Sequence, residues 1–501
     1  MNDFVTTSTG SLIRSVAWNL IGDGSPILAA VFAIPVLIRD LGNERFGVLA
    51  LAWTIVGYFG LFDVGLGRAL TKLIAEKRVV GQSADIPGLI HAALLLLLSF
   101  GAVAGLLLAG LCPWLVGHIL KIPAPLHRET LQACYLLAFS LPAGLCLSGL
   151  RGVLAAYLRF DLINSLRIPF TLFLFLGPLM VLPFSRSLAY IVALLVGARL
   201  ISCALHLLFC FRLVPELYGP LRVRTTSIMP LLRFGGWITV SNIVNPLLVY
   251  ADRFVIGALL SMEAVTWYVT PYEMVTKLVL IPGAIVVVLF PAFAESWPVA
   301  PARALLLFDR AAKYILIAMF PVILLVVTIA PQVLALWLGA NFAAHGARVL
   351  QWLALGVFIN SVAQLPFALI QAADRPDLTA KLHLIEVPVY LALLRWLIVI
   401  DGVEGAAIAW TLRMVADAAA LFVISAQFFP STAPTIRSIF GMFAMAAAGV
   451  VVGIWLPNGR ASLLFLVLAL LIFSAVTWSR LLSADEKSVL RSGPKAIWEL
   501  P

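Results

Sequence analysis

Long apolar runs of about twenty residues alternate with short polar connections along the whole chain. Runs of this length match the hydrocarbon core of a bilayer, where only helices and closed barrels satisfy their own backbone groups. The pattern predicts about fourteen membrane-spanning helices: Ser15–Ile38, Phe46–Leu66, Ile86–Pro113, Thr130–Leu154, Leu162–Phe184, Leu188–Phe211, Pro230–Ile256, Trp267–Pro291, Tyr314–Leu338, Val349–Gln371, Leu378–Ile400, Gly405–Phe428, Ile436–Leu456 and Ser462–Leu482.

The first twelve spans form two copies of one six-helix unit. The stretch Leu12-Ile13-Arg14 with Trp18 returns as Leu231-Leu232-Arg233 with Trp237, at an offset of 233 − 14 = 219 residues. Because six is even, both copies begin on the same side of the membrane, and the repeats are parallel rather than inverted. We predict an N-terminal lobe over 1–212, a cytoplasmic connector over 213–229, a C-terminal lobe over 230–429, and two additional transmembrane helices with a cytoplasmic tail over 430–501.

Composition and charge support an all-α integral membrane protein. Hydrophobic residues make up 62% of the 501 and charged residues 12%, against about half and about a quarter in soluble domains. The net charge of +10 reflects Lys and Arg gathered on the side that holds the N-terminus, about twenty against seven, as expected for cytoplasmic loops. Both termini are therefore expected in the cytoplasm, and the charge does not indicate nucleic-acid binding. The segment Met1–Ser11 lacks the features of a cleaved signal peptide.

One cytoplasmic connection has a helical pattern of its own. In Arg68–Arg78, the apolar residues Ala69, Leu70, Leu73 and Ile74 share one face. Such a segment can form an amphipathic helix, and its expected role is structural.

The five cysteines all fall in apolar runs and show no Cys-x-x-Cys spacing. They are predicted to be small buried hydrophobes rather than disulfides or metal ligands: Cys112, Cys134, Cys146, Cys203 and Cys210.

Several chemistries have no matching motif. No Gly-Lys dipeptide is present, so a phosphate-binding P-loop is excluded, and no His-Glu-x-x-His motif is found. No stretch outside the spans is long enough to fold into a soluble domain. We therefore expect a transporter that needs no cofactor rather than an enzyme.

Ionisable residues within the spans are the candidate functional residues. One at mid-bilayer costs about 2.5–3.5 kcal/mol on insertion scales, so it normally faces a partner or a polar cavity. Glu273 and Lys277 are four residues apart and can pair, as can Arg413 and Asp417. The candidates for a substrate lumen are Arg199, Arg253, Lys277, Arg167, Arg151, Asp252 and Glu273.

These residue types indicate an anionic cargo and a coupling ion. The planar fork of arginine binds two phosphate oxygens at once, so a lumen lined by arginines suits a pyrophosphate better than a cationic drug. Asp23 and Glu386 are lone embedded carboxylates, and burial can bring a carboxylate into the range where it binds H⁺ or Na⁺. Local hydrogen bonding is the alternative explanation for both residues.

Three stretches resemble a known family. Leu41-Gly-Asn-Glu-Arg-Phe-Gly47, Gly60-Leu-Phe-Asp-Val-Gly-Leu-Gly-Arg-Ala-Leu-Thr-Lys72 and Tyr250-Ala-Asp-Arg-Phe-Val-Ile-Gly257 are similar to segments of polysaccharide-repeat-unit (O-antigen type) flippases of the multidrug/oligosaccharidyl-lipid/polysaccharide exporter superfamily. The resemblance implies a V-shaped bundle around a cavity lined by spans one, two, seven and eight. It places Asp23, Asp252, Arg253, Glu273 and Lys277 near that cavity.

The leading hypothesis is a flippase of the bacterial inner membrane. The resemblance implies that it moves an undecaprenyl-pyrophosphate-linked oligosaccharide by ion-coupled alternating access, for surface polysaccharides such as O-antigen or exopolysaccharide. A polysaccharide polymerase and a chain-length regulator are the expected protein partners. The alternatives are a drug or cation antiporter, a lipid II flippase, and an integral-membrane glycan polymerase or transferase. The lipid II assignment is weakened because only Asp23 lies within span one, while Arg14 and Arg39 flank it.

Overall fold

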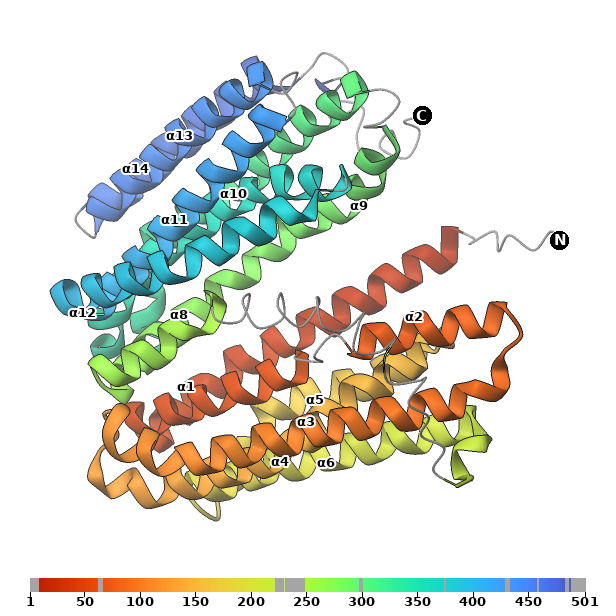
Figure 1. Cartoon of the computed structure of the whole chain (residues 1–501). Coiled ribbons are helices and arrows are strands. Elements are labelled where there is room, and N and C mark those ends of the chain that lie inside the picture. The colour runs from red at the N-terminus through yellow and green to blue at the C-terminus, as the bar shows by residue number, and fades with distance from the viewer. Residues whose placement is uncertain are drawn as a thin grey trace. The chain divides into compact units, whose positions relative to one another are not determined.

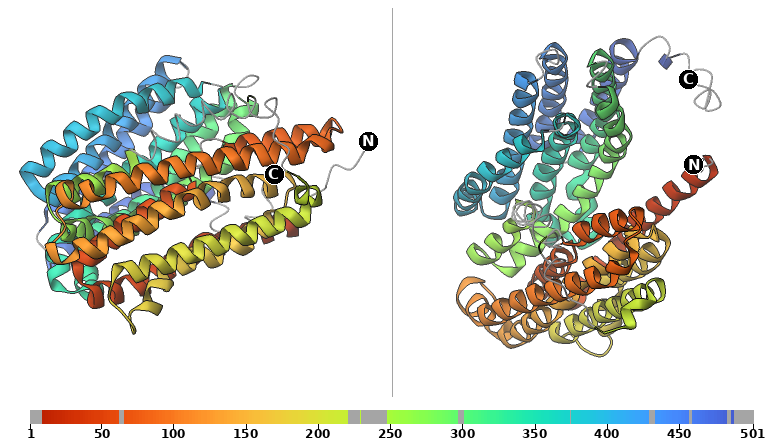
Figure 2. Two further views of the ribbon diagram at one scale, coloured as in Figure 1. Left: turned by 60° about the horizontal axis from the view of Figure 1, so that its bottom comes forward. Right: turned by 45° about the vertical axis from the view of Figure 1, so that its right-hand side comes forward.

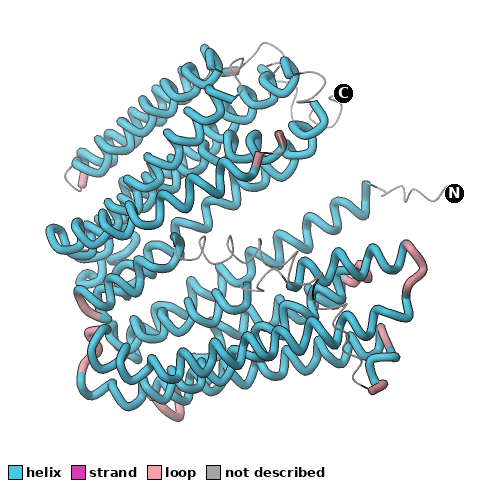
Figure 3. The backbone as a smooth tube through the Cα atoms, in the orientation of Figure 1, coloured by secondary structure: helices cyan, strands magenta, loops and turns pink. Residues whose placement is uncertain are grey.

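The computed structural model describes residues 9–61, 66–220, 229, 248–296, 301–373, 375–428, 433–456, 459–482 and 486–487. Every regular element in these ranges is a helix, and Figure 3 draws no strand. Ten helices within them are long and apolar enough to cross a membrane. The predicted all-α membrane class is therefore confirmed, while the count of fourteen spans stays a prediction.

The chain divides into two compact units, Met1–Val269 and Thr270–Pro501. The first unit contains α1 (Thr9–Leu61), α2 (Leu66–Val79), α3 (Ile86–Trp114), α4 (His127–Ala156), α5 (Phe160–Val181) and α6 (Leu188–Leu213), followed by a helix over 248–259 and the start of α8 (Met262–Thr276). A π-helix, Leu115–Ile119, extends α3, and the 3₁₀ turn Pro215–Tyr218 follows α6. Figures 1 and 2 show α3, α4 and α6 running side by side.

The second unit contains the rest of α8 and α9 (Leu280–Ser296), which a 3₁₀ turn at Lys277–Val279 joins. α10 (Pro301–Leu338), α11 (Ala340–Ala372) and α12 (Pro376–Phe428) follow, and then α13 (Ala433–Trp455) and α14 (Arg460–Val476), which ends in the π-helix Thr477–Leu481. α13 and α14 both pack against α10 (Figure 1). The predicted terminal helix pair is thus part of the second unit.

Two glycines divide the two longest helices. Gly42 in α1 has φ 80° and Gly402 in α12 has φ 59°, a backbone region that only glycine adopts at low cost. Gly42 lies between the predicted spans Ser15–Ile38 and Phe46–Leu66, and Gly402 between Leu378–Ile400 and Gly405–Phe428. Each long helix is therefore two helices joined at a turn, as the hydrophobic pattern predicts.

The helices of the first sequence repeat correspond, in the same order, to helices of the second repeat. At the offset of 219 residues, Gly42 falls on residue 261, the loop before α8. The first residues of α3 and α4 fall on residues 305 and 346, which lie in α10 and α11. Those of α5 and α6 fall on 379 and 407, on either side of Gly402 in α12. The Arg233 and Trp237 copy of the sequence motif lies outside the described residues, as do residues 221–228 of the predicted connector.

The core of the first unit includes the predicted amphipathic segment. Ala69, Leu70 and Ile74 of α2 are buried, and Leu73 packs against the same cluster. α2 lies mainly against α4, so its apolar face is covered by protein. α3 and α4 meet closely because Gly101 and Gly105 face the backbone of α4; a Cβ added at Gly105 would lie 2.6 Å from the Ala138 carbonyl oxygen.

One prediction about the cysteines is wrong. Cys112 on α3 and Cys134 on α4 form a disulfide, with their Cα atoms 6.2 Å apart. The two residues are far apart in sequence, and the antiparallel packing of their helices brings them together, so no spacing motif reveals the pair. Cys146, Cys203 and Cys210 are free thiols within buried or half-buried positions, as predicted.

Candidate substrate and ion sites

Arg199 is almost completely buried within the first unit. It lies on the inward face of α6 with Leu195, Ser202 and His206, and it is 2% exposed. Its guanidinium donates to the Val56 carbonyl oxygen of α1 and, at 3.3 Å, to Ser140 Oγ of α4. Both acceptors are neutral, so these bonds satisfy donors and leave the positive charge of Arg199 in place.

Two further arginines lie near Arg199. Arg151 on α4 and Arg167 on α5 are half-buried, and Arg151 is within electrostatic range of both Arg167 and Arg199. We call these three residues the basic cluster. Like charges repel strongly where the dielectric constant is low, so a nearby anion would stabilise the arrangement.

Asp252 and Arg253 are also buried in the first unit. Tyr268 Oη donates to Asp252 Oδ2 at 2.6 Å, and the Arg253 backbone N–H donates to Asp252 Oδ1 at 2.7 Å. The Arg253 guanidinium reaches α1 instead, where Nη1 donates to Thr54 Oγ1 at 2.8 Å. The two neighbouring side chains thus point to different partners, as adjacent positions on a helix predict.

An apolar cavity of about 330 Å³ is lined in part by Thr54, the residue to which Arg253 donates. Its walls come from α1, α3, α4 and the helix over 248–259, and they include Thr54 and Tyr250. The Arg253 guanidinium lies over the Tyr250 ring, 5.1 Å from its centre. Apolar cavities of roughly half this size stay dry and take up benzene, so this one has room for a hydrocarbon segment of about a dozen carbon atoms.

Glu273 and Lys277 form the ion pair that their spacing predicts. Lys277 Nζ lies 3.2 Å from Glu273 Oε2, and both side chains are partly exposed. They occupy the end of α8 and the following turn, in the second unit. A role in a substrate lumen stays a prediction for all seven candidates.

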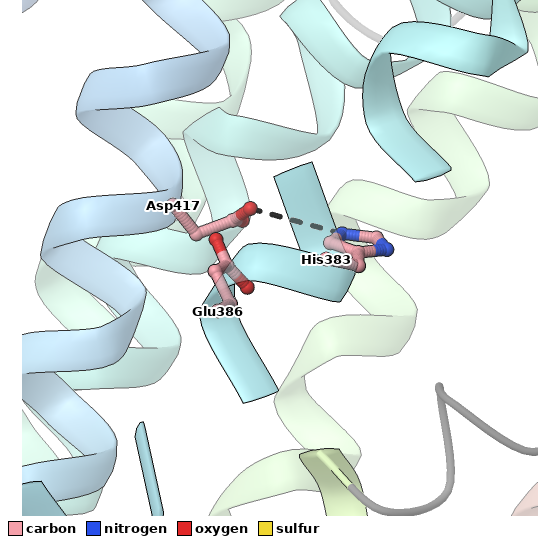
Figure 4. Close-up of side chains that lie close together, drawn as sticks. All are labelled: His383, Glu386 and Asp417. Atoms are coloured by element: carbon pink, nitrogen blue, oxygen red, sulfur yellow. Dashed lines mark ion pairs between the residues drawn. The ribbon is translucent and has the colours of Figure 1, made fainter. Parts of the chain in front are cut away.

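Four ionisable residues meet in the interior of the second unit, and we call them the acidic cluster: His383, Glu386, Arg413 and Asp417. His383 and Glu386 lie before the break at Gly402 in α12 and the other two after it. Arg413 Nε lies 3.5 Å from Glu386 Oε2, and His383 Nε2 lies 3.8 Å from Asp417 Oδ1 (Figure 4). One ligand atom each from His383, Glu386 and Asp417 lies within 4.8 Å of the others, which is close enough for the three to bind one cation.

This cluster corrects two expectations. Glu386 is not a lone carboxylate, because two helix segments bring Arg413 and Asp417 to it. The ion pair that Arg413 forms with Glu386 was not expected either, since residues four apart on the same helix suggested Asp417 as its partner. His383 and Glu386 are three residues apart and share a helix face, and this spacing was the available signal for the site. The side chains of Asp23 and Asp63 lie outside the described part of the chain.

Comparison with known proteins agrees with this architecture. Residues 12–297 match the model of a family described as polysaccharide biosynthesis protein. A protein from Shigella flexneri, named "Putative O-antigen transporter", is 32% identical to this chain over 424 residues. The match covers 81% of this chain and 96% of that protein.

Two solved structures share the fold. The lipid II flippase MurJ, in an inward closed conformation, has a TM-score of 0.65 at 12% identity, and the match covers 93% of this chain and 99% of MurJ. An inward-facing multidrug resistance MATE family transporter of the MOP superfamily has a TM-score of 0.64 at 15% identity, covering 85% of this chain and 98% of the other. The chain is a multi-pass membrane protein that shares its fold with these two transporters, and it belongs to the family of polysaccharide biosynthesis proteins.

Proposed function

We propose that this protein is a flippase that moves an undecaprenyl-pyrophosphate-linked oligosaccharide repeat unit from the inner to the outer leaflet of the bacterial inner membrane. The observation that carries the proposal is the basic cluster, together with Arg253, in the interior of the first unit. The 32% identical relative, with its name of O-antigen transporter, supports a surface polysaccharide as the product.

The basic residues suit the pyrophosphate. A guanidinium binds phosphate oxygens through charge-assisted hydrogen bonds, and several together can follow a diphosphate as it moves. Arg199 meets only neutral acceptors among its described hydrogen bonds, so an arriving anion gains the full attraction of its charge. The repulsion within the cluster falls when the anion binds, and this favours occupancy.

The apolar cavity suits the lipid part of the same cargo. It is bordered by Thr54, which holds the Arg253 guanidinium. A hydrocarbon segment in the cavity and a phosphate at Arg253 would lie next to one another, as they do in a polyprenyl diphosphate. Each CH₂ group of the lipid that the cavity buries would contribute about 0.8 kcal/mol to the free energy of binding.

We further propose that the acidic cluster couples transport to an ion gradient. Glu386 and Asp417 bring two carboxylates together, and Arg413 is a permanent cation beside Glu386. Binding of H⁺ or Na⁺ relieves the repulsion between the carboxylates. Coupling between this ion and the cargo would be reciprocal in free energy, so the ion changes cargo affinity by the factor by which the cargo changes ion affinity. Asp23 stays the second candidate for this role.

Deletion of the gene, followed by complementation with variants, tests the proposal. The deleted strain should accumulate lipid-linked oligosaccharide on the cytoplasmic face while sugar assembly continues. Arg199→Gln should restore little surface glycan and Arg199→Lys an intermediate amount, because lysine keeps the charge and loses the fork. Arg186→Gln, at an exposed position, is the matched control and should restore export fully.

The same strain separates the alternatives. Normal surface glycan with altered drug susceptibility would identify a drug antiporter and end the proposal. Accumulated lipid II with normal surface glycan would identify a lipid II flippase. Co-purification with a polysaccharide polymerase or a chain-length regulator tests the proposed protein partners.

A further inference from the structure

A second cavity, of about 540 Å³, lies at one end of the second unit. It is formed where α10 ends, α11 begins and α13 ends, and small alanines of α10 and α11 make up much of its wall. Three larger residues provide its chemistry, namely Arg348, Gln351 and Trp455. Its volume is in the range of sites that bind small molecules, about 300–1,000 Å³.

Gln351 contributes a buried hydrogen-bond acceptor. The side chain is 4% exposed, and its Nε2 donates to the Val327 carbonyl oxygen of α10 at 2.8 Å. Since a carbonyl oxygen can only accept, this bond fixes which end of the amide faces α10. Gln351 Oε1 is buried and accepts no hydrogen bond from any residue that the structure describes. Buried polar atoms normally have a partner, so this wall residue indicates a ligand with an N–H or O–H group.

Arg348 adds a charged group to the same wall. Its Nε lies 3.2 Å from Glu404 Oε1, and its Nη1 donates to the Ile454 carbonyl oxygen at 2.7 Å. The guanidinium lies 4.7 Å from the centre of the Trp455 ring. Within the described residues these bonds use two of its five N–H groups. Glu404 lies outside the cavity lining and also accepts from Trp352 Nε1 at 2.9 Å, so Arg348 is the charged group that the wall offers to an anion.

The cavity lies at the depth of lipid headgroups. α11 has 33 residues and is therefore about 50 Å long, while a hydrocarbon core is about 30 Å thick. A centred helix of this length extends about 10 Å beyond the core at each end. Arg348 is eight residues after the first residue of α11, or about 12 Å along it, which places it near the boundary. Trp455 ends α13, and tryptophan is enriched at that boundary.

We infer that this cavity binds the headgroup of a membrane glycerophospholipid that carries both a phosphate and an N–H donor, the chemistry of phosphatidylethanolamine. The phosphate bonds to Arg348, and the ammonium group donates to Gln351 Oε1. The acyl chains then lie along exposed apolar side chains at the same helix ends, such as Leu336 and Val452. The inference is independent of the cargo, because all of these residues belong to the second unit alone.

Native mass spectrometry of the detergent-purified full chain tests this site. The probes are defined phosphatidylethanolamine and phosphatidylcholine at equal concentrations. Phosphatidylcholine is the matched lipid, since its phosphate is the same and its quaternary ammonium has no N–H. The unaltered protein should retain phosphatidylethanolamine about tenfold better, the value of one hydrogen bond to a charged group.

Variants locate the preference in this cavity. Gln351→Leu should remove most of the tenfold difference while leaving binding of phosphatidylcholine unchanged. Gln371→Leu lies on the same helix 20 residues away, or about 30 Å along it, and should keep the preference. Arg348→Lys should weaken both lipids, because the phosphate is common to them, and keep their ratio.

Three results would overturn the inference. One is equal retention of the two lipids by the unaltered protein. Another is an unchanged preference in Gln351→Leu. The third is displacement of the lipid by a soluble oligosaccharide at the same site, which would assign the cavity to sugars. Thermal unfolding of each variant shows whether it is folded, so a loss of structure is not mistaken for a loss of selectivity.

Discussion

The buried arginines of the first unit meet neutral acceptors at the ends of their side chains. Arg199 donates to a carbonyl and a serine hydroxyl, and Arg253 donates to the hydroxyl of Thr54. A hydroxyl or a carbonyl satisfies a donor without cancelling its charge, so these particular bonds do not neutralise the two guanidinium groups. These arginines can be recognised in the sequence, because charges within apolar runs are rare. Their acceptors cannot, since Thr54 and Ser140 look like any small polar residue of a membrane helix.

Thr54 tests the importance of these acceptors. Thr54→Val keeps the shape of the side chain and removes the hydroxyl that accepts a hydrogen bond from Arg253 Nη1. The expected cost is about 1–3 kcal/mol, which corresponds to a fall of about 2–6 °C in the midpoint of thermal unfolding at about 2 °C per kcal/mol. Differential scanning fluorimetry of the purified protein measures it.

Thr54→Ser is the control, because serine keeps the hydroxyl and loses one methyl group. It should unfold closer to the unaltered protein than Thr54→Val does. If serine were as harmful as valine, packing of the methyl group in the wall of the apolar cavity would explain the effect, and the hydrogen bond would not.

At the scale of helices, most of the architecture follows from the sequence. A bilayer requires long apolar helices, so their positions follow from hydrophobicity, and the turns at Gly42 and Gly402 fall in the polar gaps between runs. Contacts between helices do not follow in the same way. The Cys112–Cys134 disulfide and the acidic cluster each depend on which faces of two helices meet, and no local pattern in one helix records this.

The disulfide also bears on the orientation of the first unit in the membrane. Disulfides persist in oxidising compartments such as the periplasm, so the end of α3 that carries Cys112 is expected to face that side. The N-terminal end of α3 then faces the cytoplasm, in agreement with the charge bias of the loops. Cys112 is 0% exposed in the folded chain, so labelling is done after denaturation: when the free thiols have been blocked in membranes, a maleimide added to the denatured protein should label Cys112 and Cys134 only after reduction.

A variant that lacks Cys146, Cys203 and Cys210 makes this labelling specific for the pair. Cys112→Ser in that background should expose Cys134 to oxidation or labelling without any reductant. Two thiols that react before reduction, or that stay unreactive after it, would contradict the disulfide. Loss of the bridge should lower stability by about 3 kcal/mol on the chain-entropy argument.

At the scale of the whole molecule, one matching position of the two repeats carries opposite charges, while one unit holds the basic cluster and the other the acidic cluster. Arg167 of α5 plus the offset of 219 falls on Glu386 of α12. The other two arginines of the basic cluster, Arg151 and Arg199, fall on Ile370 and Ala418 at this offset, so the two clusters share one matching position. Two parallel copies of one bundle can therefore divide the work, with the anion bound in one and the coupling ion in the other.

If the two clusters have these separate roles, substitutions in them should have different effects on transport. Glu386→Gln and Asp417→Asn remove the charges that attract H⁺ or Na⁺, so transport should lose its acceleration by an ion gradient while cargo still binds. Arg167→Gln should weaken cargo binding instead and keep the dependence on the gradient. The measurement is flipping of the extracted lipid-linked oligosaccharide in liposomes, with and without imposed pH and Na⁺ gradients.

Asp377→Asn is the control for the acidic pair, because Asp377 also lies on α12 and is exposed, paired with Arg375 and Lys381. Asp377→Asn should behave as the unaltered protein. If Glu386→Gln and Asp417→Asn still respond to a gradient, the acidic cluster does not take part in coupling, and Asp23 is the remaining candidate.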